Sequence, residues 1–352
     1  MNNSKVITIE DPQAGTLKET VLQATPRETL ALQLGKYASL REAATTSEFP
    51  ALLRDGLKAI LFDSYNSLPT TYDKWIRTES SNKPAEDWLE LARLGTLPIV
   101  GESDPYPEAE GSVDRTVRIA NNKYGMIFSI TEEMIKFDRL NMIKQYPQDM
   151  GAAAKTTLEE QAYAVLTTAG NYTRNSTTGD NDVGANTGAT TFSATGLLTA
   201  FTTLATMKDR RSGRYLNIMP DTLIVTPSLE WAAKQLLLSD TLMRAGTGAT
   251  SPGQEIYGGG TSNVIRGAVK TIIVTPWLGT SYQWVLMQKN RAAVMQEVEP
   301  LQLLIDDVRT VQNEAYFVYD KIRYRVRLWF GVGMLNDRFA YYSSSTTAPT
   351  IA

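Results

Sequence analysis

The chain of 352 residues contains no cysteine and no histidine. Without cysteine it can form no disulfide, no thiol nucleophile and no cysteine-ligated zinc site. Without histidine it lacks the usual general base near neutral pH, the Ser-His-Asp triad and the commonest metal ligand in proteins. These two absences exclude most hydrolase and metalloenzyme mechanisms. An enzyme built from this sequence would have to work with carboxylates and lysine.

Long apolar runs and an excess of positive charge are also missing. No apolar run approaches the ~20 residues that span a bilayer. The first residues, MNNSKVITIEDPQ, lack the apolar core of a signal peptide, so we expect a soluble protein made in the cytosol. The net charge of -3 argues against an overall nucleic-acid binder, although a local basic face is compatible with it. Apolar content of 42% and charged content of 21% are typical of globular domains.

The segment Gln148–Ala169 has the clearest helical pattern in the chain. Apolar residues recur in steps of three and four and so fall on one stripe of a helix. Pro147 and Asp149 indicate its start, and at 1.5 Å per residue it would be roughly 33 Å long. Periodicity alone fits an ordinary core helix, but we expect a rigid spine. The stripe consists of Met150, Ala154, Leu158, Ala162, Val165, Leu166 and Ala169.

Residues 1–84 are expected to form an N-terminal arm that is helical in places. The spacing of apolar residues predicts an amphipathic helix over Phe49–Tyr65. A second, shorter helix is predicted over Pro84–Leu94, with Trp88, Leu91 and Leu94 on one side.

A long hairpin is predicted over residues 98–120. Prolines at 98, 105 and 107 exclude a helix and favour extended strands with a turn. The tip is acidic and the returning strand is basic, which is typical of a hairpin that projects from the rest of the protein. An ordinary solvated surface hairpin is the alternative, because pairing between exposed charges contributes little. As an extended loop in contact with a neighbouring subunit, it would use Glu102, Asp104, Tyr106, Glu108, Glu110, Arg115 and Arg118.

The middle of the chain contains a strand, a long loop and a mixed region. Alternation from Tyr124 to Ile130 predicts a half-buried strand, and residues 170–195 are expected to form a loop. Within that loop, Asp180-Asn181-Asp182 weakly resembles a calcium loop, but the spacing fails and the closing glutamate is missing. We therefore predict no metal site.

Residues 197–299 read as mixed α and β. A helix is predicted over 197–207, buried strands over 221–226, 271–275 and 282–287, and a helix capped by Ser228 that runs to Leu238. Residues 246–263 are rich in glycine but lack the residues that hold phosphate in a nucleotide-binding loop, so a mobile loop is expected. Its glycines include Gly258, Gly259 and Gly260.

The strand with the strongest alternation is predicted over residues 321–330. Its apolar face must be buried, and the spine is a candidate partner. The other face carries Lys321, Arg323, Arg325 and Arg327 and is the best nucleic-acid candidate in the sequence, although a salt-bridged or solvated sheet face is favoured over it.

The order of these pieces resembles the major capsid protein fold of tailed bacteriophages, the HK97 fold. An N-terminal arm, a charged hairpin, a spine helix, a mixed α/β region and closing strands follow one another, and Mu-like head subunits are the nearest relatives that we suggest. The resemblance covers about residues 85–340, and the stretches that carry it best are Lys123–Asp138, Pro220–Leu237 and Asp320–Arg338. No motif assigns a Lys–Asn cross-link between subunits.

The resemblance implies an α+β fold with four regions. These are an N-terminal arm (1–84), an extended loop (85–125), a peripheral domain with the spine and a long sheet (126–196 and 300–345), and an axial domain (197–299). Gly258, Gly259 and Gly260 would lie in an axial loop near the five-fold and six-fold centres, where glycine tolerates differing backbone angles. Many proteins of this fold lose an N-terminal segment, but we predict that the arm here is retained and ties neighbouring subunits together.

The function that the resemblance implies is structural rather than enzymatic. Copies would assemble as pentamers and hexamers into the icosahedral head of the virion, made in the host cytoplasm, around double-stranded DNA held without sequence preference. Further partners would be a portal and scaffold or decoration proteins, with no membrane and no cofactor.

Two other functions compete with this one. A carboxylate enzyme would use Asp306 with Asp307 or Glu132 with Glu133, but adjacent residues point apart on a strand or a helix. A nucleic-acid-binding module would use the face of residues 321–327, but its aromatic residues lie on the opposite face.

Overall fold

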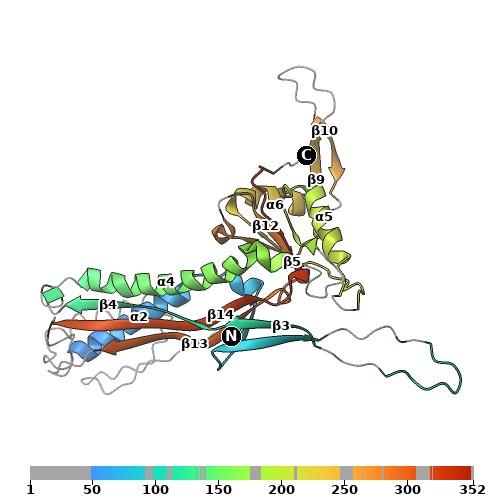
Figure 1. Ribbon diagram of the computed structural model, residues 1–352. Coiled ribbons are helices and arrows are strands. Elements are labelled where there is room, and N and C mark those ends of the chain that lie inside the picture. Colours follow the sequence, from blue (N-terminus) through green and yellow to red (C-terminus); the bar gives the residue numbers. More distant parts are fainter. Residues whose placement is uncertain are drawn as a thin grey trace, which may run out of the picture.

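The computed structural model has three visible parts: an elongated body, a smaller part above one end of it, and a projecting hairpin (Figure 1). The structure describes residues 49–349 except for 92–96, 98, 109–112, 132, 135–136, 138–139, 175–183, 210–211, 246–256, 264, 280, 307–317 and 319.

Four strands form the sheet of the body, in the spatial order β1, β13, β14 and β4. The two longest, β13 and β14, are antiparallel neighbours, β4 pairs antiparallel with β14, and β1 runs parallel to β13. Their bounds are β1 (Arg77–Ser80), β4 (Asn122–Thr131), β13 (Ala293–Asp306) and β14 (Lys321–Met334). The half-buried strand predicted around residues 124–130 is confirmed.

Strand β14 confirms the alternation predicted for residues 321–330. Its apolar side chains Val326, Leu328 and Phe330 are buried and share a core cluster with Met150 and Ala154 of the long helix α4 (Leu140–Thr167). Each buried side chain of this kind stabilises the fold by about 1.5–3 kcal/mol. The spine is therefore the partner of the apolar sheet face.

The spine helix starts earlier than the sequence pattern suggests. We expected Pro147 to mark its beginning, but α4 begins at Leu140 and Pro147 lies inside it, while its last residue is Thr167. A proline removes one backbone donor and crowds the preceding turn, so it is usually found at a helix start. In α4 the proline is buried and the helix continues through it.

Helix α2 (Phe49–Ser67) packs along the spine, and the predicted helix over residues 49–65 is confirmed. The two helices approach closely at Gly151, where an added Cβ would lie 2.6 Å from the carbonyl oxygen of Leu61. Ser64 Oγ donates a hydrogen bond of 2.8 Å to the Gln148 carbonyl oxygen. Although the sequence places these residues in an N-terminal arm, α2 and β1 are both integrated into the body.

A buried carboxylate fixes the connection between α2 and β1. Glu159 of the spine accepts hydrogen bonds from the backbone N–H groups of Thr71 and Tyr72, at the start of the 3₁₀ helix η1 (Tyr72–Lys74), and from Thr71 Oγ1 at 2.9 Å. Thr71 Oγ1 also lies 2.7 Å from the hydroxyl oxygen of Tyr163. Burial raises the pKa of Tyr163 above its ordinary value.

The smaller part is built on a five-stranded sheet in the order β11, β8, β12, β15, β7. One face packs on the end of α4 and on η5 (Pro276–Leu278), and the other is covered by α5 (Ala194–Ala205) and α6 (Glu230–Leu238). The strands are β7 (Thr187–Gly188), β8 (Thr222–Val225), β11 (Thr271–Val274), β12 (Trp284–Met287) and β15 (Ala340–Ser343). The helix and strands predicted in this region are confirmed.

Two details of this region differ from the sequence expectation. Ser228 lies within the short 3₁₀ helix η4 (Pro227–Leu229), and α6 begins after Leu229 without a side-chain cap. The segment expected to form one loop after the spine includes η2 (Ala169–Tyr172) and the short strands β5 (Thr173–Arg174) and β6 (Gly184–Ala185). The Asp180-Asn181-Asp182 stretch lies outside the described residues.

The hairpin uses a different first arm from the predicted one. Residues 84–94 were expected to form a helix, but β2 (Ala85–Leu91) is a strand that pairs antiparallel with β3 (Val113–Ala120). The described residues between 97 and 108 form no strand. The returning arm, β3, is as predicted. The outgoing arm, β2, lies where a helix was expected, and its side chains alternate between the two faces of a ribbon.

The glycine-rich stretch contains a strand rather than only a loop. Strand β10 (Tyr257–Ser262) pairs antiparallel with β9 (Thr241–Ala245), with a shift of register between Gly258 and Thr261. Gly258, Gly259 and Gly260 therefore lie in a two-stranded ribbon at the far end of the smaller part (Figure 1). Residues 246–256 lie outside the described residues.

Candidate assembly surfaces

The loop at the end of the β2–β3 hairpin extends far from the body (Figure 1). Leu97 and Ile99 are almost fully exposed, and Tyr106 is 84% exposed. A turn near the acidic tip is closed by a hydrogen bond of 3.2 Å from Asp104 N to the Gly101 carbonyl oxygen, with Ser103 at a φ of 70°. Large apolar side chains held away from their own core are typical of an interaction site.

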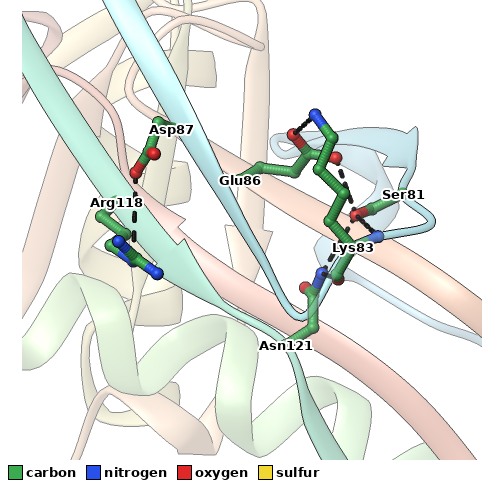
Figure 2. Close-up of polar contacts among 6 residues, drawn as sticks. All are labelled: Ser81, Lys83, Glu86, Asp87, Arg118 and Asn121. Atoms are coloured by element: carbon green, nitrogen blue, oxygen red, sulfur yellow. Dashed lines mark hydrogen bonds and ion pairs between the residues drawn. The ribbon is translucent and has the colours of Figure 1, made fainter.

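A polar network holds the base of the hairpin (Figure 2). Asn121 Nδ2 donates hydrogen bonds to Ser81 Oγ at 3.0 Å and to the Lys83 carbonyl oxygen at 2.8 Å. Ser81 Oγ donates in turn to Glu86 Oε1 at 3.1 Å, and Lys83 Nζ lies 3.0 Å from Glu86 Oε2. The hydrogen bond from Lys83 lowers the pKa of Glu86. The network joins both arms of the hairpin to the segment that leaves β1.

The hairpin lies directly on the backbone of β14. A Cβ at Gly331 would lie 2.5 Å from the Ala120 carbonyl oxygen, and one at Gly333 would lie 2.6 Å from Ile119 Cδ1. Trp329 Nε1 donates a hydrogen bond of 3.2 Å to the Asn121 carbonyl oxygen. These contacts position the stem of the hairpin, and the two glycines leave room for the Ala120 backbone and the Ile119 side chain.

The two arginines of the returning arm have partners within the chain. Arg115 Nη1 lies 3.4 Å from Oδ1 of the buried Asp337, and Arg118 Nε lies 4.0 Å from Asp87 Oδ1 across the hairpin (Figure 2). Asn336 Nδ2 also donates to Glu90 Oε1. The segment 336–338 thereby connects the hairpin to the smaller part, where Arg338 Nε donates to the Lys208 carbonyl oxygen at 2.8 Å.

The residues predicted for a loop interface are thus only partly brought together. Glu102, Asp104 and Glu108 are exposed with Tyr106 on the projecting loop, and Glu110 lies outside the described residues. Arg115 and Arg118 lie on the stem, at intrachain ion pairs. Their role between subunits stays a prediction. Sequence reasoning missed the roles of Ser81 and Asn121, and it included Asp337 only within a stretch that carries the family resemblance, because the partners of all three are remote in the chain.

Two of the four basic residues on the strand face are paired with acidic residues of the neighbouring strand. Arg323 Nη2 lies 3.0 Å from Asp306 Oδ2, and Arg327 Nη2 lies 2.5 Å from Glu299 Oε2 and 2.8 Å from Gln302 Oε1. Lys321 also takes part in an interaction, and Arg325 is exposed. This arrangement is the salt-bridged sheet face that the sequence favoured, with opposite charges paired across β13 and β14.

In the described part of the chain, charged residues do not line the two cavities beside the spine. These cavities, of about 260 and 200 Å³, lie between α4 and β4. No group of three or more acidic residues among the described ones could hold a metal ion. Asp306 pairs with Arg323, while Asp307 and Glu132 lie outside the described residues. Among the described helices, none is both long and apolar enough to cross a membrane.

The comparisons with known proteins agree with this geometry. A sequence model of the family described as "Phage capsid protein" matches residues 114–343. The capsid structure of the cyanophage P-SCSP1u is similar with a TM-score of 0.54 and 12% identity, over 80% of this chain and 89% of that one. A search of curated proteins found no match.

Two other solved structures are similar at a lower level. The procapsid of bacteriophage JBD30 has 15% identity and a TM-score of 0.43, over 86% of this chain and 77% of that one. A virus-like particle from Pyrococcus furiosus has 10% identity and a TM-score of 0.47, over 82% and 98%.

The family match spans well over half of the chain. Along the chain the hairpin comes first, followed by the spine, most of the five-stranded part and the long strands β13 and β14, which is the expected order. The chain belongs to the phage capsid protein family, has an HK97-like fold, and is a structural protein of the virion shell.

Proposed function

We propose that this chain forms the icosahedral head of a tailed phage by assembling as pentamers and hexamers around double-stranded DNA. The observation that carries the proposal is the projecting hairpin, whose exposed Leu97, Ile99 and Tyr106 have no core of their own to enter. In this proposal the loop lies on a neighbouring copy, and each subunit both gives and receives such a contact. A heterologous contact of this kind closes into rings when its rotation is suitable.

Each region of the chain has its own role in the proposed shell. Residues 126–196 and 300–345 serve as the peripheral domain, 197–299 as the axial domain, 85–125 as the extended loop, and the arm of residues 1–84 ties neighbours together. Because α2 and β1 belong to the body, we assign the tie between neighbouring subunits to the residues before α2. The axial assignment is supported by the ribbon of β9 and β10, which points away from the body (Figure 1).

Assembly is geometric rather than catalytic in this proposal. Many modest contacts per subunit, multiplied over a closed shell, give a stability that no single interface supplies. The exposed acids Glu102, Asp104 and Glu108 favour register by disfavouring wrong pairings. Mu-like head proteins remain the relatives that we suggest, with a portal and scaffold or decoration proteins as further partners.

The packaged DNA is held without sequence preference. The partly neutralised face of β14 supports this view, since the two arginines paired with Asp306 and Glu299 have little positive charge to offer to phosphates. A weakly attractive lining allows densely packed DNA to move during packaging.

Electron microscopy of the purified chain tests the proposal. We expect rings or closed shells for the native sequence at high concentration, and loss of both for a variant with Leu97→Ser, Ile99→Ser and Tyr106→Ser. The matched control is Leu304→Ser, which replaces an exposed apolar residue on β13 and should leave assembly intact. A native chain that stays monomeric at every concentration, or a triple variant that assembles normally, would contradict the proposed role of the loop.

A further inference from the structure

Helix α5 has an exposed face without any charge. Its sequence, ATGLLTAFTTLA, contains no acidic or basic residue. The residues on its solvent side recur in steps of three and four, so they form one stripe, and Leu198 in that stripe is 64% exposed. The outer faces of surface helices normally carry charged or polar residues. The stripe consists of Thr195, Leu198, Thr199, Thr202, Ala205 and Thr206.

Three of the four threonine hydroxyl groups in this stripe donate hydrogen bonds within the helix. Thr199, Thr202 and Thr206 each donate to the carbonyl oxygen four residues earlier, at 2.9, 2.9 and 2.7 Å. A hydroxyl that donates inward leaves its methyl group on the outer side. The stripe therefore presents methyl groups and a leucine to the solvent rather than a hydrogen-bonding surface.

The neighbouring helix α6 adds large apolar side chains to this face. Trp231 is 79% exposed and Leu238 is 59% exposed. The two charged residues of α6 neutralise each other, because Lys234 Nζ lies 2.5 Å from Glu230 Oε1, and Lys234 also lies over the Trp231 ring. Exposed tryptophan with few free charges is typical of the centre of a protein interface.

Both helices cover the same side of the five-stranded sheet and begin at the same end of it. Their buried residues share one core cluster with Leu223 and Leu286. Trp284 pairs with the last residues of β8 and β15, Val225 and Ser343, and its indole N–H donates to the Thr190 carbonyl oxygen just before α5. The exposed faces of α5 and α6 therefore belong to one outer surface of the smaller part.

We propose that this outer surface of α5 and α6 is a contact for a second copy of the chain. The inference rests on the proposed function, in which axial parts meet around five-fold and six-fold centres. A contact made by methyl groups, Leu198 and Trp231 depends on no directional hydrogen bond, so it tolerates a small slide between copies. One surface can then serve rings of five and rings of six, whose subunits meet at different angles.

Two substitutions at Thr202 test whether the proposed contact depends on apolar packing or on the threonine hydroxyl. Thr202→Glu places a charge in the stripe while keeping a good helix former, and a charge buried at an interface without a partner is strongly unfavourable. We expect it to reduce the yield of shells at least about tenfold. Thr202→Val keeps the methyl group and replaces the internally bonded hydroxyl by a second methyl group, so we expect shells at the native yield. Circular dichroism and thermal unfolding of the free subunits show whether both variants fold.

Chemical labelling gives a readout that does not depend on assembly being impaired. The chain has no cysteine, so Leu198→Cys introduces one reactive thiol. We expect a maleimide to label it readily in free subunits and at least about tenfold more slowly in assembled shells, with the fast rate returning after the shells are dissociated.

The outcomes distinguish this inference from the function on which it rests. If the native chain forms no shells, the proposed function fails. If native shells form, but Thr202→Glu assembles as well as Thr202→Val, or the thiol of Leu198→Cys reacts equally fast in shells and free subunits, the proposed function stands. The contact through α5 and α6 is then wrong, and that surface is free to meet solvent or another protein.

Discussion

A Cβ atom at residue 331 would lie 2.5 Å from both the Ala120 carbonyl oxygen and Asn121 Oδ1. Neither oxygen can move easily. The Ala120 oxygen belongs to the backbone, and the Asn121 side chain is held by the hydrogen bonds from its Nδ2 to Ser81 Oγ and to the Lys83 carbonyl oxygen. We expect Gly331→Ala to lower the free energy of unfolding by about 1–3 kcal/mol, as overpacking does, and to loosen the hairpin. Urea unfolding of the free subunit measures the first effect.

Gly170→Ala is the control for this substitution, since no atom lies within 4 Å of an added Cβ there. Equal stability of the two alanine variants would mean that the hairpin stem does not lie against β14 as described.

The buried tyrosines predict how stability depends on alkaline pH. Burial raises the pKa values of Tyr72, Tyr163 and Tyr172 above their ordinary value of 10.0. Because the neutral form is favoured in the folded state, this stability is fully present below pH 10 and is lost as the pH rises beyond it. We expect the urea midpoint to be constant from about pH 8 to pH 9.5 and to fall above pH 10.

Tyr163→Phe should reduce that alkaline loss, and Tyr106→Phe, on the exposed loop, should not change it. Tyrosinate absorbance followed with the unfolding curves checks the assignment. A free subunit whose buried tyrosines all ionise near pH 10 without loss of structure would contradict it.

At the scale of elements, the pairing of β13 with β14 explains why a basic strand does not make a nucleic-acid site. We expect the double variant Glu299→Gln and Asp306→Asn to release Arg327 and Arg323 from their partners. DNA affinity at low salt should then rise about tenfold, and it should fall steeply with added salt because phosphate contacts release counterions. Filter binding of the free subunit at several salt concentrations measures both.

Glu102→Gln with Glu108→Gln changes the net charge by the same amount, two units, on the distant loop. This control should leave DNA affinity near the native value. An equal rise in both double variants would show that total charge, rather than the face of β14, determines binding.

Elements next to the core could be predicted from the sequence, and elements away from it could not. In β14, burial under α4 forces apolar and polar residues to alternate, and β8 is buried throughout because both of its faces are covered. Strand β2 has no such core on both sides, and Leu89 and Leu91 are largely exposed. The three-residue spacing of Trp88 and Leu91 therefore led to the wrong prediction of a helix.

The hairpin base shows a second limit of prediction from sequence. Asn121 meets Ser81 across 40 residues and Arg115 meets Asp337 across 222, and no local pattern signals either contact. The acidic tip was recognisable because it is a local cluster of like charges between prolines. The uncharged stripe of α5 was also present in the sequence, but only the structure shows which of its residues face outward.

At the scale of the whole molecule, the described part of the N-terminal region, from Phe49 onward, stabilises the body. Helix α2 contributes Leu57 and Leu61 to the core, both nearly fully buried, and β1 extends the main sheet beside β13. Each lost leucine would cost about 1.5–3 kcal/mol through exposure of apolar surface alone. Truncations on the two sides of Phe49 should therefore behave differently.

We expect deletion of residues 1–47 to leave the free subunit folded, with a melting temperature within about 2 °C of the native one, because α2 stays whole. Shell formation should nevertheless be impaired, since the proposed arm can no longer tie neighbours together. Deletion of residues 1–67 removes α2 as well, exposes the spine at Gly151 and Leu158, and should give an aggregated or unfolded chain. Thermal unfolding and electron microscopy of both truncations measure these outcomes. Normal heads from the shorter deletion would show that assembly depends on the hairpin and the axial contacts without the arm.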